Sequence, residues 1–237
     1  MDIHQIDVAI LCGGLGMRLR PEVGDTPKVM APVGGHPFLD ILVQQVAAYG
    51  FERVILMTGY KADVVEEYFR AKKGLRFEFS REDEPLGTGG ALKNARPLIV
   101  SDPFIVLNGD SFCSINFTSF LSFHRGQRAV ATIAVAEADD KTDYGSIEMD
   151  SQGQIVQFRE KEKTASGSVG FVNAGIYCFS QDIWKRFPSV GKFSLEKDLF
   201  PGLAGHDAYG YVVEEPFMDI GTPERYHEAM KYLKKKG

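Results

Sequence analysis

Three glycines and an arginine near the start of the chain have the types and spacing of a phosphate-binding loop. Gly13, Gly14, Gly16 and Arg18 follow an apolar run. Glycines let the backbone turn tightly and approach a ligand closely, and their free amides can surround phosphate oxygens. Arg18 adds a fixed cation for a polyphosphate. The loop is neither a Walker A motif nor a dinucleotide fingerprint, because Leu19 stands where a third glycine would be. A plain tight turn is the alternative interpretation.

A lysine ten residues further on is a second candidate for contact with phosphate. Pro27 fixes the local backbone, so the side chain of Lys28 after it is held in one direction. A rigid lysine near an amide-rich loop is suited to neutralising the α-phosphate of a nucleotide. Alone, Lys28 would be interpreted as an exposed surface lysine, and it is the loop before it that favours the phosphate contact.

Two further segments place polar groups beside glycines. Segment 84–90, Glu-Pro-Leu-Gly-Thr-Gly-Gly, opens a helix, and its glycines permit close packing of a planar base on the backbone. Thr88 in this segment could instead serve only as the helix N-cap. In Asn108-Gly109-Asp110, the carboxylate at the end of a buried strand is a natural ligand for magnesium. A turn aspartate would have the same place in the sequence.

The elements that must position these segments alternate in type. The apolar patterns predict strands over 7–12, 53–58, 76–80, 103–108 and 129–136, and helices over 37–49, 61–69, 88–95 and 117–125. This order predicts an α/β fold with a Rossmann-like mixed, mostly parallel sheet flanked by helices. Ligands of such folds collect at the carboxyl ends of the strands, where the motifs above lie.

The second half of the chain has shorter predicted elements. Strands are expected over 144–149, 154–158 and 172–179, and helices over 194–203 and 223–235. Because no Pro- or Ser-rich linker interrupts the chain, we expect a single domain over 1–237. We divide it into two functional halves, about 1–125 and about 126–237.

Composition excludes several classes of protein. The formal net charge of −5 argues against non-specific nucleic-acid binding. Three cysteines without zinc spacing argue against a zinc site, and their odd number argues against a disulfide framework, so a reducing, cytoplasmic setting is expected. We find no signal-peptide pattern and no apolar run of the ~18 residues that a membrane span needs. We therefore expect neither a nucleic-acid partner nor a membrane partner.

Taken in order, the motifs resemble those of the sugar-1-phosphate nucleotidyltransferases. Gly-Gly-x-Gly-x-Arg, Pro-Lys, Pro-Leu-Gly-Thr-Gly-Gly and Asn-Gly-Asp are followed by Tyr144-Gly145, Glu160-Lys161 and the segments 173–177 and 217–223. The resemblance extends from about residue 8 to residue 226. It implies that the first half binds a nucleoside triphosphate with Mg²⁺ and the second half binds a sugar 1-phosphate. The products would be a nucleotide sugar and pyrophosphate.

The resemblance implies a role for each candidate residue. The catalytic residues would be Arg18 on pyrophosphate, Lys28 at the α-phosphate, Asp110 on the metal and Lys161 on the sugar phosphate. The nucleotide would contact Leu11, Gly13, Gly14, Gly16, Arg18, Lys28, Gly87, Thr88 and Asn108. The sugar 1-phosphate would contact Tyr144, Gly145, Glu160, Lys161, Asn173 and Glu196, and Mg²⁺ would bind Asp110 and Asp219.

Three of these assignments have simpler alternatives. Asp219 could be a turn aspartate, the run around Glu160 and Lys161 could be a solvated face, and Glu196 could only complement a helix dipole.

Within the family, segments 10–16, 30–32 and 37–39 resemble the branch that uses GTP and D-glycero-α-D-manno-heptose 1-phosphate for surface polysaccharides. The alternatives are a UTP-dependent N-acetylmuramate 1-phosphate uridylyltransferase, another sugar-1-phosphate nucleotidyltransferase and a non-catalytic nucleotide-sugar sensor.

Met17 and Val29 depart from the family pattern, which commonly has a small polar residue and a proline there. Guanine would need a hydrogen-bond acceptor, for which Glu84 or carbonyl groups near Pro85 are candidates. The compact length favours a monomer or a simple homodimer.

Overall fold

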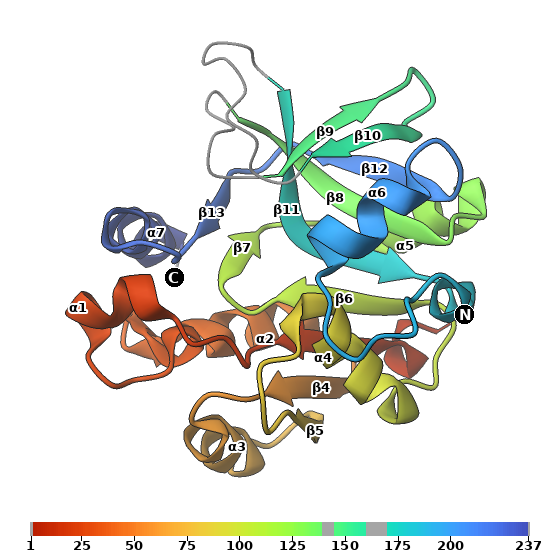
Figure 1. The fold of residues 1–237 in the computed structure, drawn as a ribbon. Helices are drawn as coiled ribbons and strands as arrows, with labels where there is room; N and C mark the ends of the chain where they lie inside the picture. Colours follow the sequence, from red (N-terminus) through yellow and green to blue (C-terminus); the bar gives the residue numbers. More distant parts are fainter. Residues whose placement is uncertain (1, 139–144, 160–169, 237) are drawn as a thin grey trace.

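A large mixed sheet forms the centre of the computed structural model, which describes residues 2–138, 145–159 and 170–236 (Figure 1). Its strands are β1 (Asp7–Leu11), β4 (Arg53–Thr58), β5 (Arg76–Arg81), β6 (Phe104–Asn108), β8 (Ala131–Ala138), β9 (Ser146–Met149), β10 (Ile155–Arg159), β11 (Gly170–Phe179) and β12 (Ala208–Val213). Within the described part of the chain these nine strands run β10-β9-β11-β6-β1-β4-β5, with β8 on β11 and β12 on β8.

The first half of the chain contains most of the parallel pairing in the sheet. β1 pairs in parallel with both β4 and β6, and β4 pairs in parallel with β5. β11 then runs antiparallel to β6 and joins the second half to the first. The predicted Rossmann-like mixed sheet is thus confirmed.

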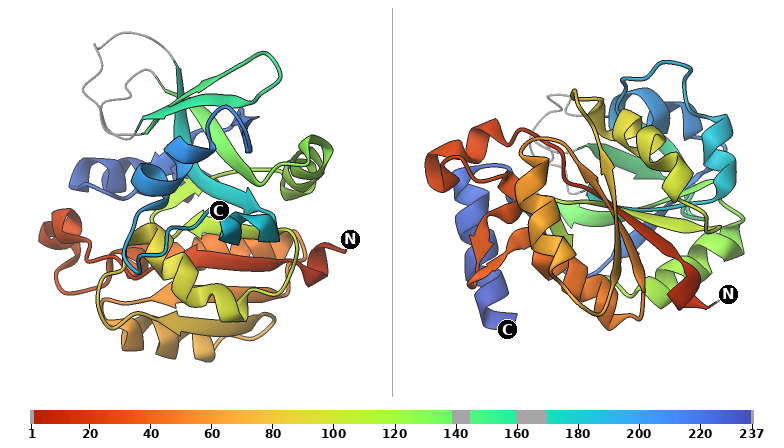
Figure 2. Two further views of the ribbon diagram at one scale, coloured as in Figure 1. Left: turned by 45° about the vertical axis from the view of Figure 1, so that its right-hand side comes forward. Right: turned by 90° about the horizontal axis from the view of Figure 1, so that it is seen from below.

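Helices cover both faces of the sheet because the strands are apolar on both sides (Figure 2). In β1, Val8 and Ile10 enter one core and Ala9 enters the other. The first core includes α2 (Phe38–Ala48), α3 (Ala62–Arg70), α5 (Phe117–Gln127) and α7 (Pro223–Lys236), and the second includes α4 (Gly87–Ala95) and α6 (Phe200–Leu203). No helix among the described residues has the length and apolar character needed to cross a membrane.

Small elements between residues 20 and 37 pack against the C-terminal helix α7. Helix α1 (Arg20–Val23) lies on the same side of the molecule as α7 (Figure 1), and the hairpin of β2 (Pro32–Val33) and β3 (His36–Pro37) contacts α7 through β2. The Tyr226 hydroxyl on α7 donates a hydrogen bond to the carbonyl of Pro32 over 2.5 Å. A ribbon of β7 (Ser111–Cys113) and β13 (Phe217–Asp219) completes this region, with Asp219 opposite Ser111.

Several elements differ from the predicted ones, most of them in the second half. The predicted helix over 194–203 is a π-helix, Leu195–Leu199, followed by α6. β12 was not predicted, and neither were the short strands β7 and β13. Strands of this kind form through pairing with distant segments, which local patterns do not report.

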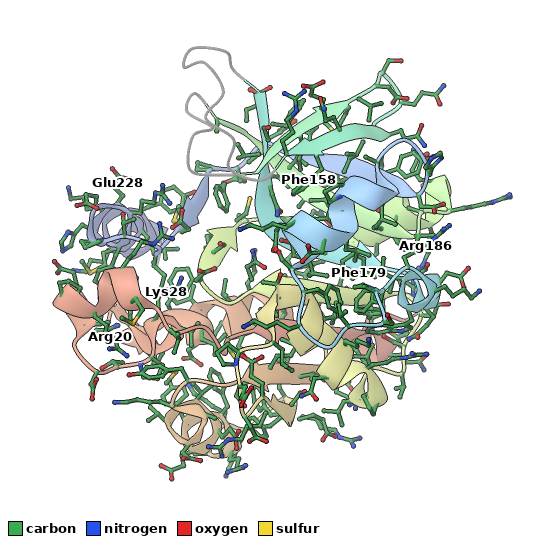
Figure 3. The ribbon with its side chains drawn as sticks, viewed as in Figure 1. Arg20, Lys28, Phe158, Phe179, Arg186 and Glu228 are labelled. Atoms are coloured by element: carbon green, nitrogen blue, oxygen red, sulfur yellow. The ribbon has the colours of Figure 1, made fainter. Side chains whose placement is uncertain are left out.

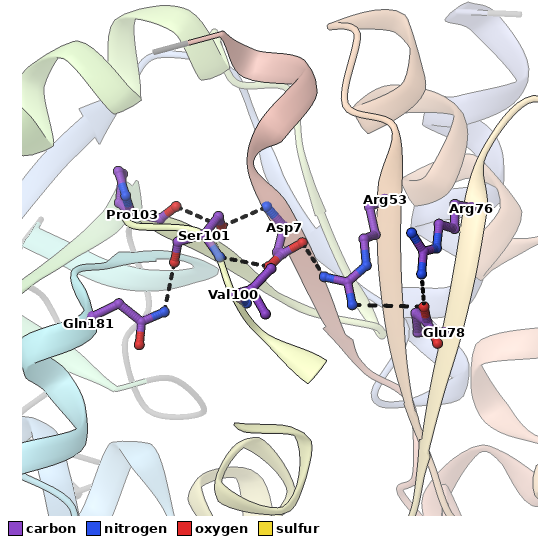
Figure 4. Close-up of polar contacts among 8 residues, drawn as sticks. All are labelled: Asp7, Arg53, Arg76, Glu78, Val100, Ser101, Pro103 and Gln181. Atoms are coloured by element: carbon purple, nitrogen blue, oxygen red, sulfur yellow. Dashed lines mark hydrogen bonds and ion pairs between the residues drawn. The ribbon is translucent and has the colours of Figure 1, made fainter. Parts of the chain in front are cut away.

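A buried polar network ties the amino ends of the strands together (Figure 4). The Asp7 carboxylate accepts hydrogen bonds from Arg53 Nη1 at 2.6 Å and from the amides of Val100 and Ser101 at 2.7 and 2.9 Å. The Ser101 carbonyl in turn accepts from Gln181 Nε2 at 2.7 Å. These contacts link β1, β4 and the segment before β6, and they fix the strands at the end opposite the motif loops.

Candidate active site

A pocket of about 430 Å³ opens at the carboxyl ends of the strands. Its lining includes most of the residues that the motifs predicted: Leu11, Gly13, Gly14, Arg18, Lys28, Gly87, Thr88, Asn108, Asp110, Gly145, Asn173, Glu196 and Asp219. Gly16 is not part of the lining. Tyr144, Glu160 and Lys161 lie outside the described residues. The fold thus brings the glycine loop, Lys28 and both aspartates to one cavity.

Gly16 contributes by position rather than by contact with the pocket. It has a positive φ of 58°, and a Cβ added to it would lie 2.7 Å from Cβ of Lys28. Any larger residue would therefore push Lys28 away while straining the turn. Gly16 therefore packs directly against Lys28, and its contact with the nucleotide stays a prediction.

Lys28 and Asp110 form an ion pair inside the pocket. Lys28 begins a 3-10 helix, Lys28–Met30, directly after Pro27, and its Nζ bonds to Oδ2 of Asp110 at the end of β6. Burial of Asp110 raises its pKa, but the charge and hydrogen bond of Lys28 and the Ser111 hydroxyl outweigh burial and hold the pKa below its usual value. The Asp110 carboxylate is therefore ionised at neutral pH.

Asp219 has a similar partner that the sequence analysis missed. Arg225, in the first turn of α7, places Nη1 at 3.2 and 3.4 Å from the two oxygens of the Asp219 carboxylate. The amide of Gly221 donates to the same carboxylate at 2.6 Å. Arg225 lines the pocket with Asp219. The signal that could have found it is its place one turn into a helix that starts just after the Asp219 motif.

The two aspartates occupy neighbouring positions of the β7–β13 ribbon. Asp219 pairs with Ser111, the residue after Asp110, and the amide of Ile220 donates to the Asp110 carbonyl at 2.9 Å. Among the described residues, no group of three or more His, Cys, Asp or Glu side chains is arranged to hold a metal. Magnesium is commonly held by one or two carboxylates together with substrate phosphates. This donor set therefore fits a magnesium ion that binds with phosphates.

One wall of the pocket consists of α4, β11 and the π-helix, and hydrogen bonds link the side chains of this wall. The Thr88 hydroxyl donates to Glu196 Oε2 at 2.6 Å and accepts from the amide of Leu195 at 2.9 Å. On the other side, Asn173 Nδ2 donates to the Tyr177 hydroxyl at 2.9 Å. Thr88 is not an N-cap, because α4 begins one residue earlier and its N-cap position lacks a side-chain hydrogen bond. Polar groups from both halves of the chain meet at this wall.

Glu82 is the second functional candidate that the sequence analysis missed. It lines the pocket, and its Oε2 accepts a hydrogen bond from the amide of Leu86 at 3.2 Å. A Cβ added to Gly13 would lie 2.7 Å from Glu82 Oε1, so only glycine lets this carboxylate approach the loop. Burial raises the pKa of Glu82, and the hydrogen bond from Leu86 lowers it in part. Glu84, the predicted acceptor for guanine, is exposed and is not part of the lining.

The pocket, with its phosphate-type loop and paired aspartates, agrees with comparisons to known proteins. Residues 8–236 match the family model described as nucleotidyl transferase. This chain belongs to the nucleotidyl transferase family. The predicted family, fold type and enzyme class are thereby confirmed for this nucleotidyl transferase. The roles of its individual side chains stay predictions.

Relatives of this nucleotidyl transferase include two guanylyltransferases. The chain is 38% identical to a mannose-1-phosphate guanylyltransferase of Mycobacterium tuberculosis, over 95% of this chain but only 64% of the relative. It is 36% identical to a D-glycero-α-D-manno-heptose 1-phosphate guanylyltransferase of Campylobacter jejuni, over 93% of this chain and 97% of the relative.

A solved structure is similar over almost the whole molecule. HddC from Yersinia pseudotuberculosis is 36% identical, with a TM-score of 0.84 over 97% of this chain and 100% of that one. The same protein in complex with GMP-PN has a TM-score of 0.83 to this chain.

Proposed function

We propose that this nucleotidyl transferase is a guanylyltransferase that joins GMP from GTP to D-glycero-α-D-manno-heptose 1-phosphate and releases pyrophosphate. The heptose 1-phosphate guanylyltransferase of C. jejuni is matched over 97% of its length and HddC over 100%, whereas the mycobacterial mannose-1-phosphate guanylyltransferase is matched over only 64% of its length. Mannose 1-phosphate is the second candidate substrate, because the mycobacterial relative has the higher identity.

The position of Glu82 in the pocket is the observation that supports guanine as the base. Guanine presents two neighbouring N–H donors, at N1 and N2, and a carboxylate offers two acceptor oxygens to them. Uracil has one N–H donor between two carbonyl oxygens, and the carboxylate would repel both oxygens. Because the Glu82 carboxylate lies in the pocket beside Gly13, it favours GTP over UTP.

For this reaction the protein has to neutralise phosphate charge and align the sugar phosphate with the α-phosphorus. An anionic oxygen of the sugar phosphate attacks the α-phosphorus and pyrophosphate leaves in line, so no protein nucleophile is needed. Two unit charges at ~4 Å repel by about 4 kcal/mol at an effective dielectric constant near 20. Lys28 would neutralise the α-phosphate and Arg18 the departing pyrophosphate, and both line the pocket. Lys161, outside the described residues, keeps its predicted role on the sugar phosphate.

Magnesium, held by Asp110 and Asp219, would supply further charge neutralisation between the two phosphate groups. Lys28 already holds Asp110, so its amino group would exchange part of that contact for a phosphate oxygen when the nucleotide binds. The charge of the magnesium ion would then keep Asp110 ionised in place of the charge of Lys28.

The division of labour between the two halves is part of the proposal. The first half supplies the glycine loop, Lys28 and Glu82 to the nucleotide, and the second supplies Asn173 and Glu196 to hydroxyl groups of the sugar. We also propose a cytoplasmic location and a monomer or simple homodimer.

Pyrophosphate release in magnesium tests the proposal directly. The four nucleoside triphosphates are each combined with D-glycero-α-D-manno-heptose 1-phosphate, mannose 1-phosphate, glucose 1-phosphate and N-acetylmuramate 1-phosphate, and products are identified by mass. We expect turnover with GTP and the heptose phosphate. Preference for mannose 1-phosphate would replace the sugar while keeping the base, and turnover with UTP alone would refute the guanine assignment.

A further inference from the structure

Both aspartates proposed for the metal are occupied by side-chain cations of the protein itself. Lys28 bonds to Asp110, and Arg225 contacts both oxygens of Asp219. Lys28 already has a predicted role at the α-phosphate of the nucleotide, and its position beside Asp110 fits that role. Arg225 has no such assignment, and it comes from the opposite end of the chain.

Arg225 stands where a cation bound to Asp219 would have to go. The Asp219 side chain is 9% exposed, and the Gly221 amide already donates to its Oδ1. Gly221 also lies close to Arg18, since a Cβ added there would be 3.7 Å from Arg18 Nη2. A magnesium ion needs an oxygen of Asp219 on the side that faces the pocket, and the Arg225 guanidinium lines that same pocket.

The backbone that carries Arg225 is anchored, so the side chain is the part that can move. The next residue, Tyr226, bonds through its hydroxyl to Pro32 and through its amide to the Thr222 carbonyl, over 2.5 and 2.9 Å. The Arg225 side chain is 19% exposed and has several rotatable bonds. Figure 3 shows Glu228, which lies on α7 like Arg225, on the same side of the molecule as Lys28. Arg186 lies on the opposite side.

We propose that Arg225 is a positioning residue that neutralises Asp219 in place of the metal until a metal–nucleotide complex enters the pocket. The inference rests on the proposed function, because it takes Asp219 as a metal ligand. While Arg225 occupies Asp219, the free protein binds divalent metal weakly. The nucleotide phosphates bring further oxygen ligands, so metal and triphosphate together displace the guanidinium. Arg225 thereby makes metal binding depend on nucleotide.

Binding of Mn²⁺ to the nucleotide-free protein tests this inference. Mn²⁺ prefers the same oxygen ligands as Mg²⁺, and its free concentration can be measured by electron paramagnetic resonance. We expect Arg225→Gln to bind Mn²⁺ about tenfold more tightly than the wild type, which corresponds to about 1.4 kcal/mol. Arg186→Gln, which removes an arginine from its ion pair with Asp207, is the matched control and should leave Mn²⁺ affinity unchanged.

Unchanged or weaker Mn²⁺ binding by folded Arg225→Gln would overturn the inference. If that variant does not fold, Arg225→Lys carries the test: it keeps the charge but loses the planar fork, and we expect affinity to rise about threefold. No gain in folded Arg225→Lys would then overturn it equally.

A second substitution separates this inference from the proposed reaction. Asp219→Asn added to Arg225→Gln should abolish the gain in Mn²⁺ affinity, and a gain that persists would mean that Asp219 is not the ligand. The measurement needs neither GTP nor a sugar phosphate. An error in the proposed substrates would therefore leave its outcome unaffected.

Discussion

The two ends of the sheet hold the same kind of ion pair for different purposes. At the amino ends, Asp7 is 3% exposed and is held by Arg53 and by backbone amides, with its acceptors directed into the protein. At the carboxyl ends, Asp110 is 33% exposed and, like Asp219, faces the pocket. An aspartate held largely by backbone donors cannot change partners without unfolding. One held by a long side-chain cation beside a cavity can exchange that cation for a ligand.

The largest effect should come from breaking the amino-end pair. Asp7→Ala leaves the mostly buried Arg53 guanidinium, 18% exposed, without its main partner, and we expect a loss of about 3–5 kcal/mol in the free energy of unfolding in urea. Activity per folded molecule should not change. The matched control is Asp63→Ala, which removes an exposed pair with Arg81 and should cost about 0–1 kcal/mol. Equal losses in the two variants would show that the Asp7 network is not a structural anchor.

Breaking the pair at the other end should reduce catalysis rather than stability. In Lys28→Met the α-phosphate loses its cation, and we expect kcat to fall about 10²- to 10³-fold, as for removal of one preorganised donor in other enzymes. Lys61→Met is the control, because Lys61 lies near the same loop but pairs with exposed Asp25. Steady-state pyrophosphate release measures both. A fall of less than fivefold in Lys28→Met would remove Lys28 from the mechanism.

The base end of the pocket gives a sharper test of specificity. Glu82→Gln replaces one carboxylate oxygen, an acceptor, by an amide NH2 group, which is a donor. A hydrogen bond from an N–H group of guanine to the charged carboxylate is therefore lost. Such a bond contributes about 1.5–3 kcal/mol, and kcat/KM for GTP should therefore fall about 10- to 100-fold. Glu84→Gln is the matched control two residues away, exposed and outside the pocket, and should behave as wild type. If the two variants had the same kcat/KM for GTP, Glu82 would not read the base.

The same contrast explains which parts were predictable from the sequence. The strand predicted over 53–58 has these same bounds in the structure, because a continuous apolar run between polar ends is a local signal. The glycine loop and Asp110 were also found locally, since each follows a strand whose end can be recognised, and Lys28 was found through Pro27 and the glycine loop before it. Contacts with the sugar side could be assigned only through family resemblance.

Arg225 and Glu82 were not found from apolar runs and strand ends. Arg225 lies in a charged first turn of a helix, which has the pattern of a solvated surface. It reaches the pocket only because β13 pairs with β7, more than 100 residues earlier in the chain. Glu82 is one of several acidic residues before Pro85, and its neighbour Glu84 is exposed. Which of them faces Gly13 depends on where β5 ends beside the glycine loop.

The smallest predicted effect is a pH dependence of stability that arises from the Lys28–Asp110 pair. The pKa of Asp110 is lowered from 3.8 by Lys28, so between the folded value and 3.8 the unfolded chain binds more protons than the folded one. The stabilisation is therefore complete above pH 3.8 and is lost as pH falls through the folded value. Because the pair is partly exposed, we expect Asp110→Asn to cost only about 1 kcal/mol at pH 7 without metal. Urea unfolding at pH 7, 5 and 3 should show this difference shrinking only at the lowest pH. A difference that is constant down to pH 3 would mean that the Lys28 contact does not depend on the charge of Asp110.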